Sequence, residues 1–158
     1  MLLDKYLVEQ FINVTSAAAI ASSKFVGKNN KIIADEAATE AMRKNLNKLD
    51  IDGKVVIGEG ELDEAPMLFI GEKLGSGNGP SIDIAVDPLE GTNFAANNLP
   101  GALSVMAIAE KNNLFMAPET YMSKIAVGNL ENGVVDLDFS LKKNISNLSD
   151  AKIRNFQK

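Results

Sequence analysis

The hydrophobic residues change their spacing once along the chain, and this change restricts the folds that the chain can adopt. Apolar residues in segments 4–26 and 34–49 recur every three or four positions, as on one face of an α-helix. Gly27 and Asp52-Gly53 follow these segments and are typical of a helix end and a turn. Beyond them, short segments rich in β-branched residues predict strands. Two helices should therefore precede a sheet.

The expected strands are short and closely spaced. They are predicted at residues 54–57, 82–86, 102–109, 114–116, 123–127 and 134–137. Segment 82–86 should end where Asp87-Pro88 begins a turn, and segment 114–116 should form a hairpin with 102–109. We expect an α+β fold in which two N-terminal helices pack on a mostly antiparallel sheet, followed by a polar tail from residue 142.

Composition excludes several kinds of chemistry. The 158 residues include no Cys and no His, which excludes thiol nucleophiles, disulfides, His-based triads and zinc held by His or Cys. The net charge of −5, with no cluster of Lys and Arg, argues against nucleic acid as a partner. No segment has the apolar length of a membrane span or the pattern of a signal peptide. A cytoplasmic protein is therefore expected.

Acidic residues gather at three places where an expected element begins or ends. Asp35 lies near the start of the second helix, four residues after Lys31. Segment 58–64, Gly-Glu-Gly-Glu-Leu-Asp-Glu, follows one strand, and segment 87–92, Asp-Pro-Leu-Glu-Gly-Thr, follows another. Segments at the ends of elements often carry functional residues.

Carboxylates in such numbers suit hard divalent cations. Mg²⁺ and Mn²⁺ prefer carboxylate, carbonyl and phosphate oxygens, and two ions about 3.5–4 Å apart can hold a phosphoryl group and lower the pKa of a water. Asp87 and Glu90 could face one ion beside the Leu89 carbonyl. Pro88 would set a sharp turn, and Gly91 would leave room for phosphate.

The Thr92 hydroxyl could then orient a water, with Asp35 as its proton acceptor. Each feature alone also has an ordinary structural explanation. Asp35 could be a helix N-cap, Lys31 a surface residue, segment 58–64 a solvated loop and segment 87–92 a plain turn. The functional interpretation depends on all of them occurring together in one order.

Two longer segments make the pattern specific. Residues 57–73, Ile-Gly-Glu-Gly-Glu-Leu-Asp-Glu-Ala-Pro-Met-Leu-Phe-Ile-Gly-Glu-Lys, and residues 83–92 resemble the signatures of class II (GlpX-like) fructose-1,6-bisphosphatases. Segments 34–43 and 117–124 are similar to that family as well. The turn at 87–92 is shared with the wider superfamily of lithium-sensitive sugar phosphatases, which includes inositol monophosphatases. The resemblance extends from about residue 11 to residue 137.

This resemblance implies a layered α/β sandwich of the sugar-phosphatase type. It also implies hydrolysis of the 1-phosphate of fructose 1,6-bisphosphate to fructose 6-phosphate, a step of gluconeogenesis, with a two-metal site for Mn²⁺ or Mg²⁺. The implied metal ligands are Asp35, Glu59, Asp87, Leu89 and Glu90. The implied substrate contacts are Glu90, Gly91, Thr92 and Tyr121. The residues implied near the reacting phosphate are Lys31, Glu61, Asp63 and Thr92.

Family members are about twice as long as this chain, so the resemblance covers their N-terminal half. Residues 1–141 would form the metal-binding α+β domain, and residues 142–158 lie where the family continues into a second domain. The isolated chain is then expected to be a weak phosphatase or none, and to associate with itself or with the missing half. The alternatives are a phosphatase for another phosphomonoester, such as an inositol, nucleotide or sedoheptulose phosphate, and a non-catalytic remnant.

Overall fold

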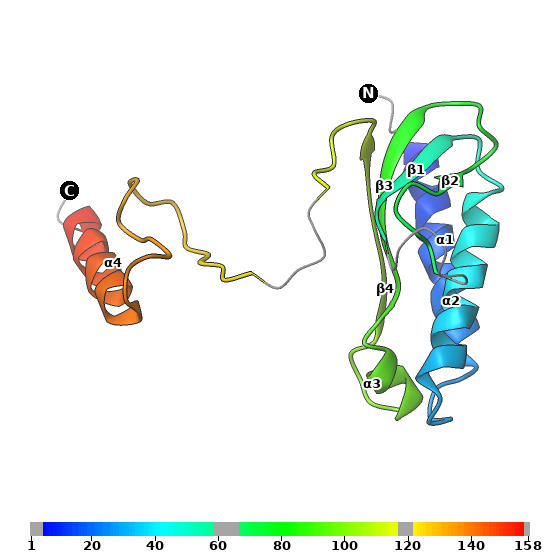
Figure 1. The fold of residues 1–158 in the computed structure, drawn as a ribbon, viewed down its shortest axis with the longest axis horizontal. Helices are drawn as coiled ribbons and strands as arrows, with labels where there is room; N and C mark the ends of the chain where they lie inside the picture. Colours follow the sequence, from blue (N-terminus) through cyan, green and yellow to red (C-terminus); the bar gives the residue numbers. More distant parts are fainter. Residues whose placement is uncertain (1–4, 59–66, 117–121, 157–158) are drawn as a thin grey trace. The chain divides into compact units, whose positions relative to one another are not determined.

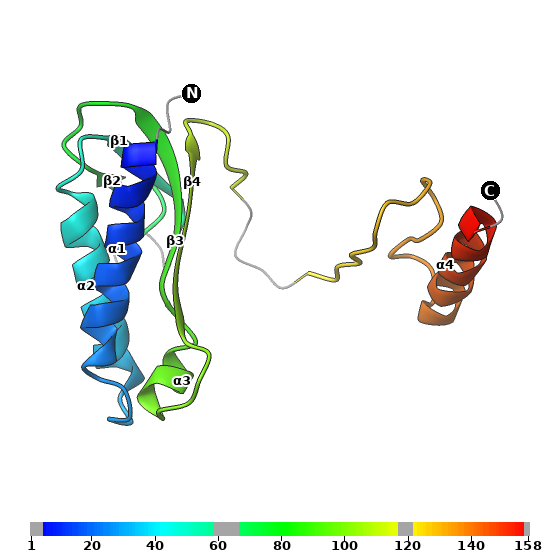
Figure 2. The ribbon, with the colours of Figure 1, turned by 180° about the vertical axis from the view of Figure 1, so that it is seen from behind.

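Two long helices lie side by side against one face of a sheet (Figures 1 and 2). The computed structural model describes residues 5–58, 67–116 and 122–156, and the chain divides into the units Met1–Ala117 and Pro118–Lys158. The first unit contains α1 (Lys5–Ser23), α2 (Lys31–Leu46), β1 (Asp52–Ile57), β2 (Lys73–Leu74), β3 (Ser81–Glu90), α3 (Thr92–Ala96) and β4 (Leu103–Glu110). The second unit contains α4 (Leu141–Phe156).

The start of α2 lies three residues before the predicted one, because Asn30 is its N-cap. Asn30 has an extended backbone, and its Oδ1 accepts a hydrogen bond of 3.2 Å from the Ile33 N–H. This satisfies one of the free N–H groups at the helix start. The alternative that Asp35 is the N-cap is therefore wrong, and Asp35 lies within the helix.

The sheet is mixed and has the strand order β2-β1-β3-β4. The β1 strand pairs antiparallel with β2 and parallel with β3, whereas β3 and β4 pair antiparallel. Two of these three pairings are antiparallel, and the helices form a separate layer on the sheet. The predicted α+β fold is confirmed.

The strand predicted at residues 82–86 corresponds to β3, but its predicted end at residue 86 is wrong, because β3 continues through Asp87-Pro88 to Glu90. Its register with β4 shifts on the way: Asp87 lies opposite Val105, and Glu90 lies opposite Leu103. One extra residue of β3 is thus accommodated as a bulge. Pro88 has no N–H to give to the ladder, and bulges are where sheets tolerate proline. The chain turns later than predicted, at Gly91.

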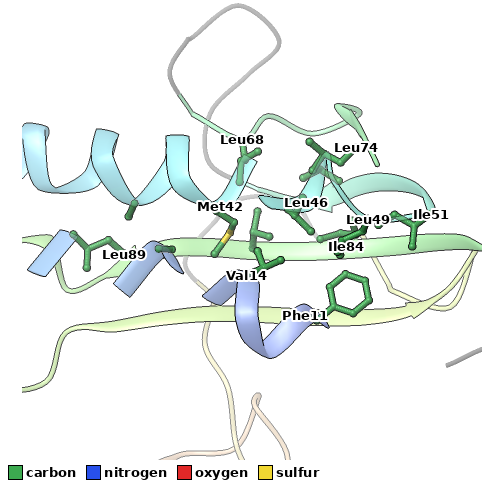
Figure 3. Close-up of a cluster of buried hydrophobic side chains, with 14 of the residues drawn as sticks. Phe11, Val14, Met42, Leu46, Leu49, Ile51, Leu68, Leu74, Ile84 and Leu89 are labelled. Atoms are coloured by element: carbon green, nitrogen blue, oxygen red, sulfur yellow. The ribbon is translucent and has the colours of Figure 1, made fainter. Parts of the chain in front are cut away.

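The core lies between the two long helices and the sheet (Figure 3). Phe11 and Val14 come from α1, Met42 and Leu46 from α2, and Ile84 from β3. Each of these side chains is at most 5% exposed. The apolar faces predicted for the helices are therefore the buried ones. Within the described ranges, no helix is long and apolar enough to cross a membrane.

The strands predicted at residues 114–116, 123–127 and 134–137 are wrong. In the first and the last of these segments, side chains form hydrogen bonds with backbone groups that a neighbouring strand would otherwise bind. The N–H groups of Asn113 and Leu114 both donate to Asp83 Oδ2, at 3.1 and 3.3 Å, so residues 114–116 form no hairpin partner for β4. In residues 134–137, Asn144 donates to the Asp136 carbonyl and Asn147 to the Val134 carbonyl.

The segment 123–127 has no strand structure either, although it contains β-branched residues. Ile125 and Val127 are 41% and 42% exposed, so no neighbouring layer buries them. The polar tail predicted from residue 142 forms most of α4, and the Ser140 Oγ accepts a hydrogen bond from the Lys143 N–H at the start of this helix.

Candidate active site

A cavity of about 280 Å³ lies between the N-terminal half of α2, the start of α3 and the residue Met67. Lys31, Asp35 and Thr92, three of the residues singled out from the sequence, line it together. The other lining residues are Ile32, Glu36, Thr39 and Met67. The fold therefore brings the start of the second helix and the end of the Asp-Pro-Leu-Glu-Gly-Thr segment to one place.

The α2 helix contributes a row of polar residues to this cavity. Lys31, Asp35 and Thr39 are separated by four residues each, a spacing that places successive side chains on nearly the same side of a helix. Lys31 is exposed, Asp35 is partly buried and Thr39 is only 1% exposed, so the row runs from solvent into the protein. Arg43 continues the row at the same spacing.

Backbone hydrogen bonds fix α3 against the start of α2. In the loop that joins α1 to α2, the Gly27 N–H donates to the Ala95 carbonyl at 2.9 Å, and the Asn29 N–H donates to the Ala96 carbonyl at 2.8 Å. Gly27 is left-handed with φ of 75°, a conformation that favours glycine. The loop and α3 thus hold Thr92 close to the residues of α2.

Gly91 has a backbone role at the junction of β3 and α3. Its φ is 77°, and an added Cβ would lie 3.0 Å from Cδ2 of Phe94. The Phe94 N–H donates to the Gly91 carbonyl at 2.8 Å, which starts the short helix. The turn itself thus requires this glycine, in addition to the room for phosphate expected from the sequence.

Asp87 and Glu90 lie on either side of the β3 bulge and interact with each other. The pKa of Asp87 is raised from 3.8 to about 6, chiefly by burial and further by a hydrogen bond with Glu90 and by the negative charge of Glu90. The charge of Asp35 also raises this pKa, whereas a hydrogen bond with the backbone of Leu89 lowers it. Two of the predicted metal ligands, Glu90 and Asp35, therefore act electrostatically on a third, Asp87.

Two carboxylate oxygens of this group, Oδ1 of Asp35 and Oδ1 of Asp87, are buried and have no hydrogen-bond partner within residues 5–58, 67–116 and 122–156. Burial and the neighbouring charge of Glu36 raise the pKa of Asp35. An unpaired buried acceptor is costly, and a carboxylate is the preferred ligand of a hard cation. These oxygens therefore fit a divalent ion such as Mn²⁺ or Mg²⁺.

The remaining predicted site residues, Glu59, Glu61, Asp63 and Tyr121, lie outside the described residues. In the described part of the chain, no three or more acidic, His or Cys side chains are arranged so that they could hold a metal ion. The described residues thus present two carboxyl groups, each with one unpaired oxygen, and a neighbouring acid, not a complete metal centre.

Thr39 and Met67 line the cavity but were not predicted from the sequence as site residues. The four-residue spacing that relates Lys31 to Asp35 leads directly to Thr39, so this spacing was an available signal. Met67 had no such signal, because its place depends on contacts between distant segments.

Together, the fold and this site define an α+β protein with a cavity between α2 and α3 and with partly buried carboxylates on α2 and β3. Comparison with known families then gives a narrower assignment. The family model for bacterial, glpX-encoded fructose-1,6-bisphosphatase matches residues 5–158. The chain belongs to this family, and the resemblance seen in its signature segments is confirmed.

Curated relatives agree with the family. Proteins of Prochlorococcus marinus strains MIT 9301 and MIT 9303, named D-fructose 1,6-bisphosphatase class 2/sedoheptulose 1,7-bisphosphatase, are 49% identical to the chain over 148 and 147 residues. The protein of the same name from strain MIT 9313 is 48% identical over 147 residues. These alignments cover 93–94% of the chain but only 44% of each relative. The chain thus spans less than half the length of these relatives.

Proposed function

We propose that the chain contributes the cation-binding part of a phosphatase site that removes the 1-phosphate of fructose 1,6-bisphosphate. The observation that carries this proposal is that the Oδ1 atoms of Asp35 and Asp87 are buried and have no hydrogen-bond partner among the described residues. Asp35 lines the cavity together with Lys31 and Thr92. The names of the relatives support the substrate class and add sedoheptulose 1,7-bisphosphate as a second substrate.

The proposed ligands are the carboxylates of Asp35, Glu59, Asp87 and Glu90 together with the Leu89 carbonyl. A divalent ion bound there would polarise the phosphoryl group and make a water more acidic. The raised pKa of Asp87, about 6, means that the metal-free site readily takes up a proton. Cation binding should therefore release protons in slightly acidic solution.

The other residues act on substrate. The Lys31 ammonium, exposed at the edge of the cavity, can offset the charge of a phosphate. The Thr92 hydroxyl can orient the attacking water, with Asp35 as proton acceptor. By their positions in the family signatures, Glu61 and Asp63 belong near the reacting phosphate. Glu90, Gly91 and Tyr121 belong to the substrate contacts.

Two properties of the whole protein form part of the proposal. The relatives continue well beyond the length of this chain, and we propose that efficient turnover needs the remaining part, from a longer protein, a partner chain or a second copy. We also place the reaction in the cytoplasm, where a protein without cysteine needs no disulfides.

Mn²⁺ binding tests this proposal first. Calorimetry on the chain should show binding that Asp35→Asn and Asp87→Asn each weaken about tenfold or more. Glu40→Gln, which removes an exposed carboxylate from the same helix without changing the cavity lining, serves as the control and should leave binding unchanged. If the wild type and all three variants bound Mn²⁺ with equal affinity, the assignment of Asp35 and Asp87 as ligands would be overturned.

Phosphate release tests the substrate. The panel is fructose 1,6-bisphosphate, sedoheptulose 1,7-bisphosphate and an inositol monophosphate, each with Mn²⁺ or Mg²⁺. The proposal predicts release from the sugar bisphosphates, weak for the chain alone. Release from the inositol phosphate only would favour the other phosphomonoester class, and cation binding without any turnover would favour a non-catalytic remnant.

A further inference from the structure

Arg43, the last residue of the polar row on α2, connects this helix to the segment that carries Met67. Its Nε donates to Oε1 of Glu72 at 2.7 Å, and its Nη2 donates to the Met67 carbonyl at 2.6 Å. A further contact of 3.3 Å joins Nη2 to Oε2 of Glu72. The guanidinium thus holds both ends of segment 67–72 at once.

The pair is not a loose surface contact. The side chain of Arg43 is 28% exposed and that of Glu72 only 11%. Glu72 Oε2 also accepts from the Phe69 N–H, at 3.3 Å, so the same carboxylate orders the inside of the segment. Charge-assisted bonds in such a partly buried place contribute more than exposed ion pairs do.

The other side of segment 67–72 is held by β1. The Gly71 N–H donates to the Val55 carbonyl at 2.8 Å, and the Val55 N–H donates to the Glu72 carbonyl at 2.9 Å. At Gly58, an added Cβ would lie 2.2 Å from the Leu68 carbonyl oxygen, so these two backbones approach closely. The segment is therefore fixed between a strand and, through Arg43, a helix.

Fixing this segment matters because Met67 lines the same cavity as Asp35 and Thr92. Arg43 itself does not line the cavity, but it binds the Met67 carbonyl from the helix that also carries Asp35. Lysine could not replace it fully, because a single ammonium lacks the planar set of donors that reaches a carboxylate and a carbonyl together.

We propose that Arg43 is a positioning residue, which acts through Met67 and Glu72 to hold the wall of the cavity at the distance from Asp35 that ligand binding needs. The importance of that wall for cations and phosphate rests on the proposed function. The positioning itself concerns only residues 43, 67 and 72 and can be tested without any ligand.

Methyl NMR provides the ligand-free test. The chain has six methionines, and with ¹³C-labelled methyl groups the Met67 signal can be assigned by Met67→Leu. In Arg43→Met and the milder Arg43→Lys, we expect the Met67 signal to shift and sharpen while that of the core residue Met42 stays in place. An unchanged Met67 signal in both variants would overturn the proposal.

Paramagnetic Mn²⁺ provides the functional test. In the wild-type chain, Mn²⁺ should broaden the Met67 signal, and Arg43→Met should raise the concentration for half-broadening about tenfold, as for other groups that orient ligands. Leu74→Ala, which removes a buried side chain close to residues 67–72 in the sequence, is the control for general destabilisation. It should lower the midpoint of unfolding without changing the Mn²⁺ concentration at which the Met67 signal is half broadened.

The outcomes distinguish the positioning role of Arg43 from the proposed cation site. If Leu74→Ala raises the Mn²⁺ concentration as much as Arg43→Met at equal loss of stability, Arg43 has no positioning role. If Mn²⁺ broadens no signal in the wild-type chain, the proposed cation site fails. The Met67 signal of the Arg43 variants then still decides whether Arg43 fixes this wall.

Discussion

Replacing Asp87 by asparagine should stabilise the metal-free protein at neutral pH. Burial, a hydrogen bond with Glu90 and the charges of Glu90 and Asp35 raise the pKa of Asp87 from 3.8 to about 6. The folded state thus binds a proton at Asp87 more tightly than the unfolded chain does. Ionisation of Asp87 therefore opposes folding, and asparagine removes that cost.

The size of the effect follows from the pKa. A tenfold change in acidity corresponds to about 1.4 kcal/mol, so a rise from 3.8 to about 6 corresponds to at most about 3 kcal/mol. Asp87 is only partly buried, and solvent screens part of this energy, which leaves about 1–2 kcal/mol. The destabilisation is absent below pH 3.8, grows between pH 3.8 and 6, and is complete above pH 6.

Urea unfolding followed by circular dichroism measures this difference, because the chain has no tryptophan for fluorescence. Asp87→Asn should match the wild type near pH 3.8 and exceed its free energy of unfolding by about 1–2 kcal/mol at pH 7.5. A difference that does not depend on pH, or a variant less stable than the wild type at pH 7.5, would refute the reasoning.

Mn²⁺ should reverse the order of the two proteins. At a free concentration 100 times its Kd, a ligand that binds only the folded state adds about 2.7 kcal/mol of stability. The wild type should gain this stabilisation, and Asp87→Asn, having lost a ligand, should gain little. If both proteins gained equally, Asp87 would not be a ligand, although the pH dependence without metal could still hold.

Three further substitutions probe the framework around the site. Leu46→Ala removes a fully buried side chain from the core and should lower the free energy of unfolding by about 3 kcal/mol in urea. Asn30→Ala removes the N-cap bond to the Ile33 N–H and should cost about 1 kcal/mol, whereas an unchanged stability would mean that this cap contributes nothing. Gly58→Ala would place its Cβ 2.2 Å from the Leu68 carbonyl oxygen, so it should cost about 2 kcal/mol by overpacking, measured against Gly128→Ala, whose Cβ would meet no atom within 4 Å.

The sequence predicted those features that depend on neighbouring residues. The spacing of Phe11, Val14, Met42 and Leu46 identified the buried faces of α1 and α2, because a helix repeats every 3.6 residues whatever it packs against. Leu141, Ile145 and Leu148 are spaced by four and three residues, which would likewise have revealed α4, but the polar residues between them concealed it.

Features that depend on distant residues were harder to predict. The extension of β3 to Glu90 requires a partner strand that accepts a bulge at Pro88. The missing strand at 114–116 depends on Asp83, a buried carboxylate that binds the backbone of the following turn. For the site, Lys31, Asp35 and Thr92 were expected and line one cavity, whereas Met67 was not expected and accepts a hydrogen bond from Arg43, which lies 24 residues before it in the sequence.

The row on α2 has a consequence for how this helix can change during evolution. Residues 31, 35, 39 and 43 drift by only about 40° per step around the axis, so one helix supplies both the cavity lining and the bond to Met67. One inserted residue between Asp35 and Thr39 would rotate the second half by about 100° and separate Arg43 from its partners. Between Asp35 and Arg43, α2 can therefore change by substitution but not by a single insertion.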